Sequence, residues 1–203
     1  MTPPAPPPEP DGRRERSRRS REVAIAAANA LFLEHDYVTT TMGGVAERAG
    51  VSEQSLYYLF GTKSELLAAV LAASVRGDGE PVPVVDQPWV DGLAEAPDAT
   101  TAVEQMIASS IEIVARTAAI YGVVQRGSAD PDVRELLEVT RRRRRSDQRR
   151  LIGVLADAGH LRPGADLAAA ADVFYGLVNE EVYLLLTVDC GWSHDRFRTW
   201  VTS

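Results

Sequence analysis

Hydrophobic residues recur at helical spacing over most of the chain, and no stretch shows the alternation of apolar and polar residues that marks a strand. The clearest pattern lies in residues 41–60, where two short apolar stripes are separated by a single turn. The first stripe consists of Val45, Ala46 and Ala49, and the second of Leu56, Leu59 and Phe60. This pattern predicts two short helices, each with one face turned to a core.

The turn between these helices has residues suited to a tight corner. Gly50 can adopt the positive φ angle that ends a helix, which a residue with a Cβ atom resists. Ser52 can accept a hydrogen bond from the free amides that begin the next helix. Gly43 and Gly44 predict a frayed start for the first helix, since glycine costs about 1 kcal/mol per helical position relative to alanine. Two short helices joined in this way indicate a helix-turn-helix, whose outward front would carry Gln54, Ser55, Tyr57 and Tyr58.

The same periodicity predicts further helices before and after this motif. Their expected bounds are 20–35, 62–76, 101–116, 118–125, 130–158, 166–190 and 193–201. Helix starts are indicated by Thr62 with Glu65, which can form a capping box, and by Asp130 followed by Pro131. Residues 77–100 are rich in glycine, proline and acidic residues, which predicts a loop. The chain is therefore expected to be all-α.

Composition divides the chain into three parts. Residues 1–12 are rich in proline and residues 13–21 contain six arginines, which together predict a disordered arm over residues 1–19. We expect a helix-turn-helix domain over residues 20–76 and a second helical domain over residues 77–203. The arginines of the arm have two interpretations. They form either a solvated charge run or an arm that follows DNA phosphates beside the main site.

The net charge of −7 argues at first against a nucleic-acid partner, but the distribution of charge removes the objection. Residues 1–76 carry nine basic and nine acidic side chains, so the acidic excess belongs to residues 77–203. DNA binding depends on a local basic face and not on the sum over the chain. The five consecutive arginines at 141–145 spread around a helix, which predicts a solvated or salt-bridged face.

Several chemistries find no support in the sequence. The single cysteine, Cys190, excludes an internal disulfide and a cysteine-based zinc cluster, and it fits a reducing cytoplasm. The histidines, His35, His160 and His194, lie far apart, so we expect neither a metal site nor a cofactor. No Ser-His-Asp order or glycine-rich phosphate loop indicates an enzyme. No apolar run approaches the roughly 18 residues of a membrane span.

Residues 20–73 resemble the DNA-binding domain of the TetR family of bacterial transcription regulators. The resemblance is carried by an ordered set of residues, namely Ala27, Ala30, Leu31, Phe32, Thr41, Val45, Ala46, Ala49, Gly50, Val51, Ser52, Leu56, Tyr57, Phe60, Lys63, Leu66 and Leu67. A weaker resemblance to regulatory domains of the same family covers parts of residues 161–193.

The resemblance implies a three-helix N-terminal domain that binds DNA and a C-terminal helical domain that dimerises and holds a small-molecule effector. The homodimer would form through the family's helices 8 and 9, which correspond to residues 166–190 and 193–201. The implied function is a cytoplasmic, sequence-specific transcription regulator, a repressor that the effector releases from a palindromic operator. A ligand- or protein-binding helical module without DNA reading is the alternative.

The resemblance also assigns DNA-binding residues, which are Thr41, Ser52, Gln54, Ser55, Tyr57, Tyr58 and Lys63. Glutamine can bond bidentately to adenine, and serine can bond to either kind of base edge. Lys63 stands at the N-terminal end of a helix, where its charge opposes the helix dipole. An external contact, such as a DNA phosphate, is therefore expected for it.

Candidates for the effector pocket follow from residue type alone. They are polar or aromatic residues on otherwise apolar helices, namely Trp89, Gln105, Met106, Tyr121, Gln125, Tyr175 and Asn179. Packing in the core is the competing interpretation for each of them, because aromatic residues and methionine are often buried.

Overall fold

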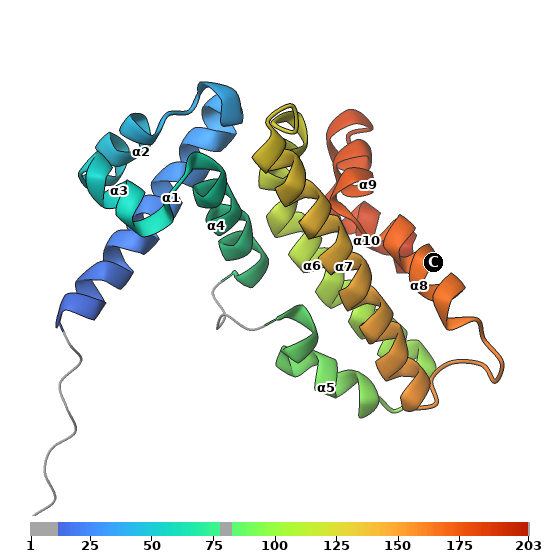
Figure 1. The fold of residues 1–203 in the computed structure, drawn as a ribbon. Helices are drawn as coiled ribbons and strands as arrows, with labels where there is room; N and C mark the ends of the chain where they lie inside the picture. Colours follow the sequence, from blue (N-terminus) through green and yellow to red (C-terminus); the bar gives the residue numbers. More distant parts are fainter. Residues whose placement is uncertain (1–11, 78–82, 203) are drawn as a thin grey trace, which may run out of the picture. The chain divides into compact units, whose positions relative to one another are not determined.

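The computed structural model describes residues 12–77 and 83–202, and every regular element in these ranges is a helix (Figure 1). The all-α prediction is therefore confirmed. The chain divides into two compact units, Met1–Val70 and Leu71–Ser203, so the border lies inside the fourth helix and not at its end. Each unit has its own buried residues and is described by itself.

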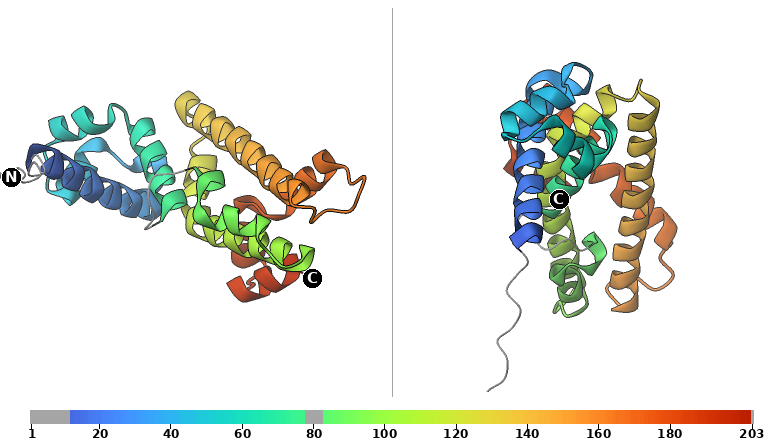
Figure 2. Two further views of the ribbon diagram at one scale, coloured as in Figure 1. Left: turned by 90° about the horizontal axis from the view of Figure 1, so that it is seen from below. Right: turned by 60° about the vertical axis from the view of Figure 1, so that its left-hand side comes forward.

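The first unit contains α1 (Gly12–Thr39), α2 (Met42–Ala49), α3 (Glu53–Phe60) and the beginning of α4 (Lys63–Arg76) (Figures 1 and 2). Its core takes large side chains from all four helices. The most completely buried of them are Phe32, Val45, Leu56, Leu66 and Leu67. The apolar stripes that the sequence shows in α2 and α3 thus face a common core.

α1 begins at Gly12, so the start expected at residue 20, and the disorder expected just before it, are wrong. Arginine and glutamate are good helix formers, and here they also pair across one helical turn. Arg18 donates to Glu22 at 2.6 Å and to Glu15 at 3.2 Å. Residues 1–11, which make up the rest of the predicted arm, lie outside the described residues.

One residue interrupts α1 near its end. Asp36 has a φ of 63°, in a region that residues with a Cβ atom rarely adopt. The Thr40 hydroxyl donates to Asp36 O at 2.7 Å and to Leu31 O at 3.2 Å. The Tyr37 ring stacks on the Phe32 ring with centroids 6.1 Å apart. These contacts hold the strained residue in place and end α1 just before α2 begins.

The second unit contains the end of α4 and a set of further helices. They are η1 (Val84–Asp86), α5 (Pro88–Ala94), α6 (Ala99–Arg126), α7 (Pro131–Asp157), α8 (Leu167–Leu177), α9 (Glu180–Leu184), the π-helical η2 (Leu185–Asp189) and α10 (His194–Thr202). α7 packs against both α6 and α8, and α9 packs against α6 (Figure 1). The apolar core between them includes Leu93, Ile111, Leu151, Leu155, Phe174 and Phe197.

Two predictions for the segment before α7 are wrong. α6 is one continuous helix, where separate helices were expected over 101–116 and 118–125. Thr117 does not end the helix, because its buried hydroxyl donates to Ile113 O at 2.8 Å and so finds a partner within α6. The loop expected over 77–100 contains η1 and α5, and α6 begins before it ends.

The single helix expected over 166–190 is broken. Asn179 lies at the break in an extended conformation. Its side-chain amide donates to Tyr175 O and Gly176 O, both at 3.0 Å, and its Oδ1 accepts from Val182 N at 2.9 Å. One side chain therefore satisfies the last carbonyls of α8 and the first amides of α9.

By length and composition, α6 could cross a membrane. However, 56% of its most apolar window is buried inside the unit, where α6 contacts α5, α7, α9 and α10. A central helix surrounded by other helices is apolar on more than one face for this reason.

Candidate nucleic-acid interface and buried polar cluster

α2 and α3 are joined by a turn whose geometry matches its sequence. Gly50 has φ 66° and ψ 31°, and its N–H donates to Glu47 O at 3.2 Å. A Cβ atom at this position would meet no atom within 4 Å, so the backbone conformation, and not a lack of space, favours glycine. The Ser52 Oγ accepts from Ser55 N at 3.1 Å and caps α3. The predicted turn and cap are confirmed.

The two faces of α3 differ as the periodicity predicts. Its back faces the core of the first unit and carries Leu56, Leu59 and Phe60. Its front is exposed and carries Gln54, Ser55, Tyr57 and Tyr58. Tyr58 is 87% exposed, so neither its ring nor its hydroxyl is taken up by the fold. An exposed amide and two exposed phenol groups on one face of a short helix can contact base edges and phosphates in a major groove.

Thr41 caps α2. Its Oγ1 accepts from Gly44 N at 3.1 Å, and α2 includes both Gly43 and Gly44. The frayed start predicted from the two glycines is therefore wrong, because this cap and the buried Met42 side chain hold the first turn.

Lys63 is directed inward and not outward as expected. Its Nζ donates to Tyr37 O at 2.8 Å and to Thr40 O at 3.0 Å, and it lies 4.2 Å from the centroid of the Tyr37 ring. These carbonyls lie at and just beyond the end of α1, so the ammonium meets the negative end of that helix dipole although it stands at the positive end of its own helix. Lys63 thus joins α4 to the end of α1, and a phosphate contact by Lys63 stays a prediction.

A cluster of polar side chains lies in the second unit, where α9 meets α6 and α7. Glu181 Oε1 accepts from the Tyr121 hydroxyl at 2.8 Å, from Gln125 Nε2 at 2.9 Å and from Arg141 Nη2 at 2.6 Å. Burial raises the pKa of Glu181, but hydrogen bonds from Arg141 and Tyr121 outweigh it and hold the pKa below its ordinary value. The carboxylate is therefore charged at neutral pH.

The neighbouring carboxylate, of Glu180, is 6% exposed and has different partners. It forms an ion pair with Arg144 and accepts from the Thr117 hydroxyl at 3.0 Å. The Arg144 guanidinium also lies 5.4 Å from the centroid of the Tyr121 ring and 5.0 Å from that of Tyr175. Side chains from α6, α7, α8 and α9 thus meet in this polar cluster.

The structure brings some of the predicted effector residues together and separates others. Those in or beside the polar cluster are Tyr121, Gln125, Tyr175 and Asn179. Two others pack with the apolar core, namely Trp89 and Met106. The Trp89 indole N–H donates to Gln87 Oε1 at 2.9 Å, and Gln105 is exposed.

Sequence reasoning missed the charged members of the polar cluster. The salt-bridged interpretation of the arginine run is confirmed for Arg141, Arg144 and Arg145, the last of which lies 3.2 Å from Asp172. Adjacent glutamates diverge on a helix, and here each of them meets a different arginine of α7. The sequence does contain a sign of this cluster, because Glu180 and Glu181 interrupt an apolar segment that follows an arginine-rich helix.

No group of His, Cys, Asp and Glu side chains within residues 12–77 and 83–202 could hold a metal ion. His194 lies instead 3.1 Å from Glu112 and 3.2 Å from the Tyr183 hydroxyl. Cys190 is exposed. The described side chains therefore present hydrogen-bonding and apolar surfaces, not a metal centre.

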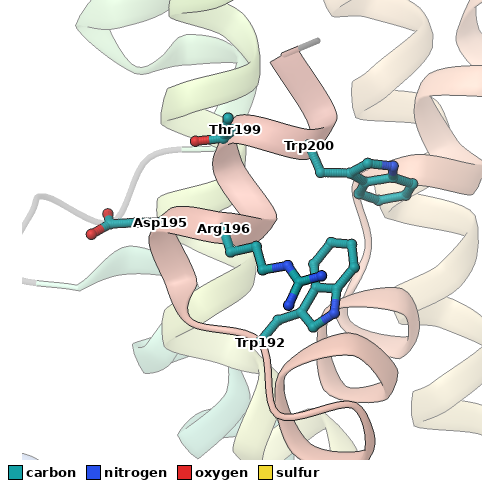
Figure 3. A pocket seen from close by; sticks show the side chains of 5 residues that line it. All are labelled: Trp192, Asp195, Arg196, Thr199 and Trp200. Atoms are coloured by element: carbon teal, nitrogen blue, oxygen red, sulfur yellow. The ribbon is translucent and has the colours of Figure 1, made fainter.

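Two indole rings lie at an open hollow on and just before α10 (Figure 3). Trp192 and Trp200 meet edge to face with ring centroids 5.9 Å apart. The Arg196 guanidinium lies 4.2 Å from the centroid of the Trp192 ring. Further exposed apolar side chains lie on α8 and η2, namely Leu167, Val173, Leu177, Leu185 and Val188.

The segment that contains α2 and α3 is similar to a known protein family. Residues 24–70 match the family model described as bacterial regulatory proteins, tetR family. None of the curated proteins matches the chain in sequence.

Solved structures share the fold over nearly the whole length. A Mesorhizobium loti protein assigned to the TetR-family transcriptional regulators has a TM-score of 0.71 and 20% identity, covering 92% of this chain and 93% of its own. FadR from Bacillus subtilis, in complex with stearoyl-CoA, has a TM-score of 0.67 and 16% identity, covering 89% and 95%. NalD, the secondary repressor of the MexAB-OprM multidrug efflux pump in Pseudomonas aeruginosa, has a TM-score of 0.64 and 19% identity, covering 91% and 93%.

Proposed function

We propose that the chain, whose residues 24–70 match the tetR family of bacterial regulatory proteins, is a sequence-specific transcription regulator, a cytoplasmic repressor that a small-molecule effector releases from its operator. The observation that carries the proposal is the exposed front of α3. Its amide and phenol groups lie on one exposed face, where Tyr58 is 87% exposed.

The front of α3 supports reading of the major groove. Gln54 can bond to an adenine edge, and Tyr57 and Tyr58 can reach phosphates or thymine methyl groups. Thr41 and Ser52, at the N-terminal ends of α2 and α3, are placed to approach the DNA backbone. These residues, together with Ser55 and Lys63, form the proposed DNA-binding set.

Exposed apolar side chains of the second unit support the proposed homodimer. Val173 and Leu177 of α8 are one helical turn apart and both exposed, as are Leu185 and Val188 of η2. Trp200 adds a large exposed ring on α10. Exposed large apolar side chains of this kind are typical of an interaction surface. Pairing through this surface would give two copies of α3 for two halves of a palindromic operator.

The proposed effector binds in the second unit. Tyr121, Gln125 and Tyr175 lie beside the apolar core, and an effector binding there would exchange their present hydrogen bonds with Glu181 and Arg144 for its own. α4 begins in the first unit and ends in the second, so it is the covalent link through which an effector would act on the DNA-binding helices. A coupling of about 1–3 kcal/mol would suffice to change operator occupancy.

Selection of bound duplexes from a random DNA pool tests the proposal. The wild-type protein is expected to enrich a palindromic site. Gln54→Ala and Tyr58→Ala should each weaken binding to that site about tenfold or more, because a good base contact is worth about 1–3 kcal/mol. Val38→Ala truncates an exposed side chain outside α2 and α3 and is the matched control.

The same variants distinguish a DNA-binding regulator from a module that binds only ligands or proteins. If the variants lose DNA binding but keep the dimer and ligand binding, the regulator is supported. A wild-type protein that prefers no duplex, yet dimerises and binds ligands, would instead be a ligand- or protein-binding module.

A further inference from the structure

Arg21, near the start of α1, contacts α3. Its Nη1 donates to Leu59 O at 2.9 Å, across 38 residues of sequence. Its guanidinium carbon also lies 4.5 Å from the centroid of the Phe60 ring. Arg18, one turn earlier, pairs only with Glu15 and Glu22 of its own helix in the contacts that the structure describes.

The contact falls where α3 most needs a partner. The last carbonyls of a helix have no amide within the helix to accept from, and they form the negative end of its dipole. Leu59 lies in the last turn of α3, so the Arg21 guanidinium supplies both a donor and a positive charge there. The Phe60 side chain below it is buried and therefore offers a fixed surface for the planar group.

Because α3 is short, the contacts at its two ends largely set its orientation. It has eight residues, and the Ser52 hydroxyl and the Gly50 turn fix its beginning. Arg21 joins its other end to α1, the longest helix of the first unit. The buried Phe60 side chain also holds this end, and the Arg21 contact adds a polar link to α1 that further limits how far the front of α3 can turn.

We propose that Arg21 is a positioning residue for DNA reading, which sets the orientation of Gln54 and Tyr58 by holding the end of α3, and not a phosphate contact of the arginine run. The inference rests on the proposed function, since it concerns how the same surface reads DNA. One arginine of the run is thus assigned to α3 and not to DNA, because its guanidinium already contacts Leu59 O and the Phe60 ring.

Salt dependence distinguishes the two uses of an arginine. Each phosphate contact that is lost lowers the slope of log K against log salt by about 0.9. A positioning residue leaves that slope unchanged, while its loss reduces the preference for the operator over a scrambled duplex. Arg21→Gln and Arg18→Gln each remove one positive charge from α1, so they are matched in charge and differ in the contact with α3.

We expect Arg21→Gln to reduce the operator preference about tenfold, as fits the loss of a charged hydrogen bond, with the wild-type salt slope. Arg18→Gln should change binding to both duplexes by the same factor. Arg21→Lys keeps the charge and one donor but loses the planar group, so it should restore only part of the preference. A lower salt slope for Arg21→Gln with the preference intact would overturn the inference.

Amide hydrogen exchange in the absence of DNA gives the second readout. The Gly61 N–H donates to Tyr57 O at 2.8 Å and reports on the end of α3. Arg21→Gln should accelerate exchange there several-fold, and Arg18→Gln should not. Unchanged exchange in Arg21→Gln would overturn the inference even if the wild type binds its operator. A wild type that prefers no duplex overturns the proposed function, whereas the exchange result still decides whether Arg21 holds α3.

Discussion

Two basic side chains of the first unit and one of the second have different kinds of partner. In the first unit, Lys63 and Arg21 donate to backbone carbonyl oxygens near helix ends, at 2.8 and 2.9 Å. In the second unit, Arg144 pairs with the carboxylate of Glu180, and the two side chains are only 13% and 8% exposed. A carbonyl at a helix end carries a partial charge that water can also satisfy, whereas a buried carboxylate depends on its counter-charge.

The difference shows which part of the molecule tolerates the loss of a charge. Removing Lys63 or Arg21 leaves a neutral carbonyl without its charged donor. Removing one partner from the buried pair leaves a charge in surroundings that cannot solvate it. Losing the Lys63 or Arg21 charge should therefore cost less stability than losing one partner of the buried Arg144–Glu180 pair.

The largest expected effect comes from Glu180→Ala. It should lower the free energy of unfolding by about 3–5 kcal/mol, because the Arg144 charge stays buried without its partner. Glu34→Ala is the matched control, since Glu34 pairs with Arg48 in the first unit where both side chains are nearly half exposed. That control should have little effect. Urea unfolding followed by circular dichroism measures both.

The double variant Arg144→Met with Glu180→Met tests whether the lost stability comes from an unpaired buried charge. It removes both charges, so most of the lost stability should return. The Thr117 hydroxyl stays satisfied in this variant, because it also donates to Ile113 O at 2.8 Å. A Glu180→Ala variant that loses no more stability than Glu34→Ala would contradict the comparison of the two units.

Features that depend on a few neighbouring residues could be predicted from the sequence. The capping box is an example, with Thr62 N donating to Glu65 Oε2 at 2.8 Å and Glu65 N donating to Thr62 Oγ1 at 3.1 Å. The Gly50 turn and the front of α3 are of the same kind. In each case the hydrogen bond or the helical face is set within about one turn of chain.

Features that depend on distant partners could not be predicted. Lys63 turns inward because carbonyls more than twenty residues earlier face it, and the sequence around Lys63 gives no sign of them. The break between α8 and α9 lies in an apolar segment whose pattern favours one helix. It is stabilised by Asn179 and by Gln148 of α7, which donates to Val178 O at 3.0 Å.

A smaller effect is expected from Lys63→Met, which keeps the apolar stem and removes the ammonium. The end of α1 loses a charged donor, so the free energy of unfolding should fall by about 1 kcal/mol. The salt slope of DNA binding should stay at its wild-type value. A slope lower by about 0.9 would mean that Lys63 also contacts a phosphate. Lys63→Arg keeps the charge and serves as the control for the slope.

The smallest effect concerns Asp147 of α7, where burial and arginine neighbours oppose each other. Burial raises the pKa of Asp147 above its ordinary value of 3.8, although Arg143 and Arg150 act to lower it. For Glu181 the balance has the opposite sign, since direct hydrogen bonds from Arg141 and Tyr121 outweigh burial. Asp147 and Glu181 thus differ in whether the fold favours their charged form.

The raised pKa fixes the sign of the Asp147→Asn prediction. Between the unfolded and the folded pKa the folded protein binds more protons, so stability falls as pH rises through this window and stays lower above it. Asp147→Asn removes that loss and should raise Tm slightly at pH 7. The gain should vanish below the ordinary value of 3.8, where both states are protonated. Thermal unfolding at several pH values measures it. A lower Tm at pH 7 would mean that Arg143 and Arg150 stabilise the carboxylate more than burial destabilises it.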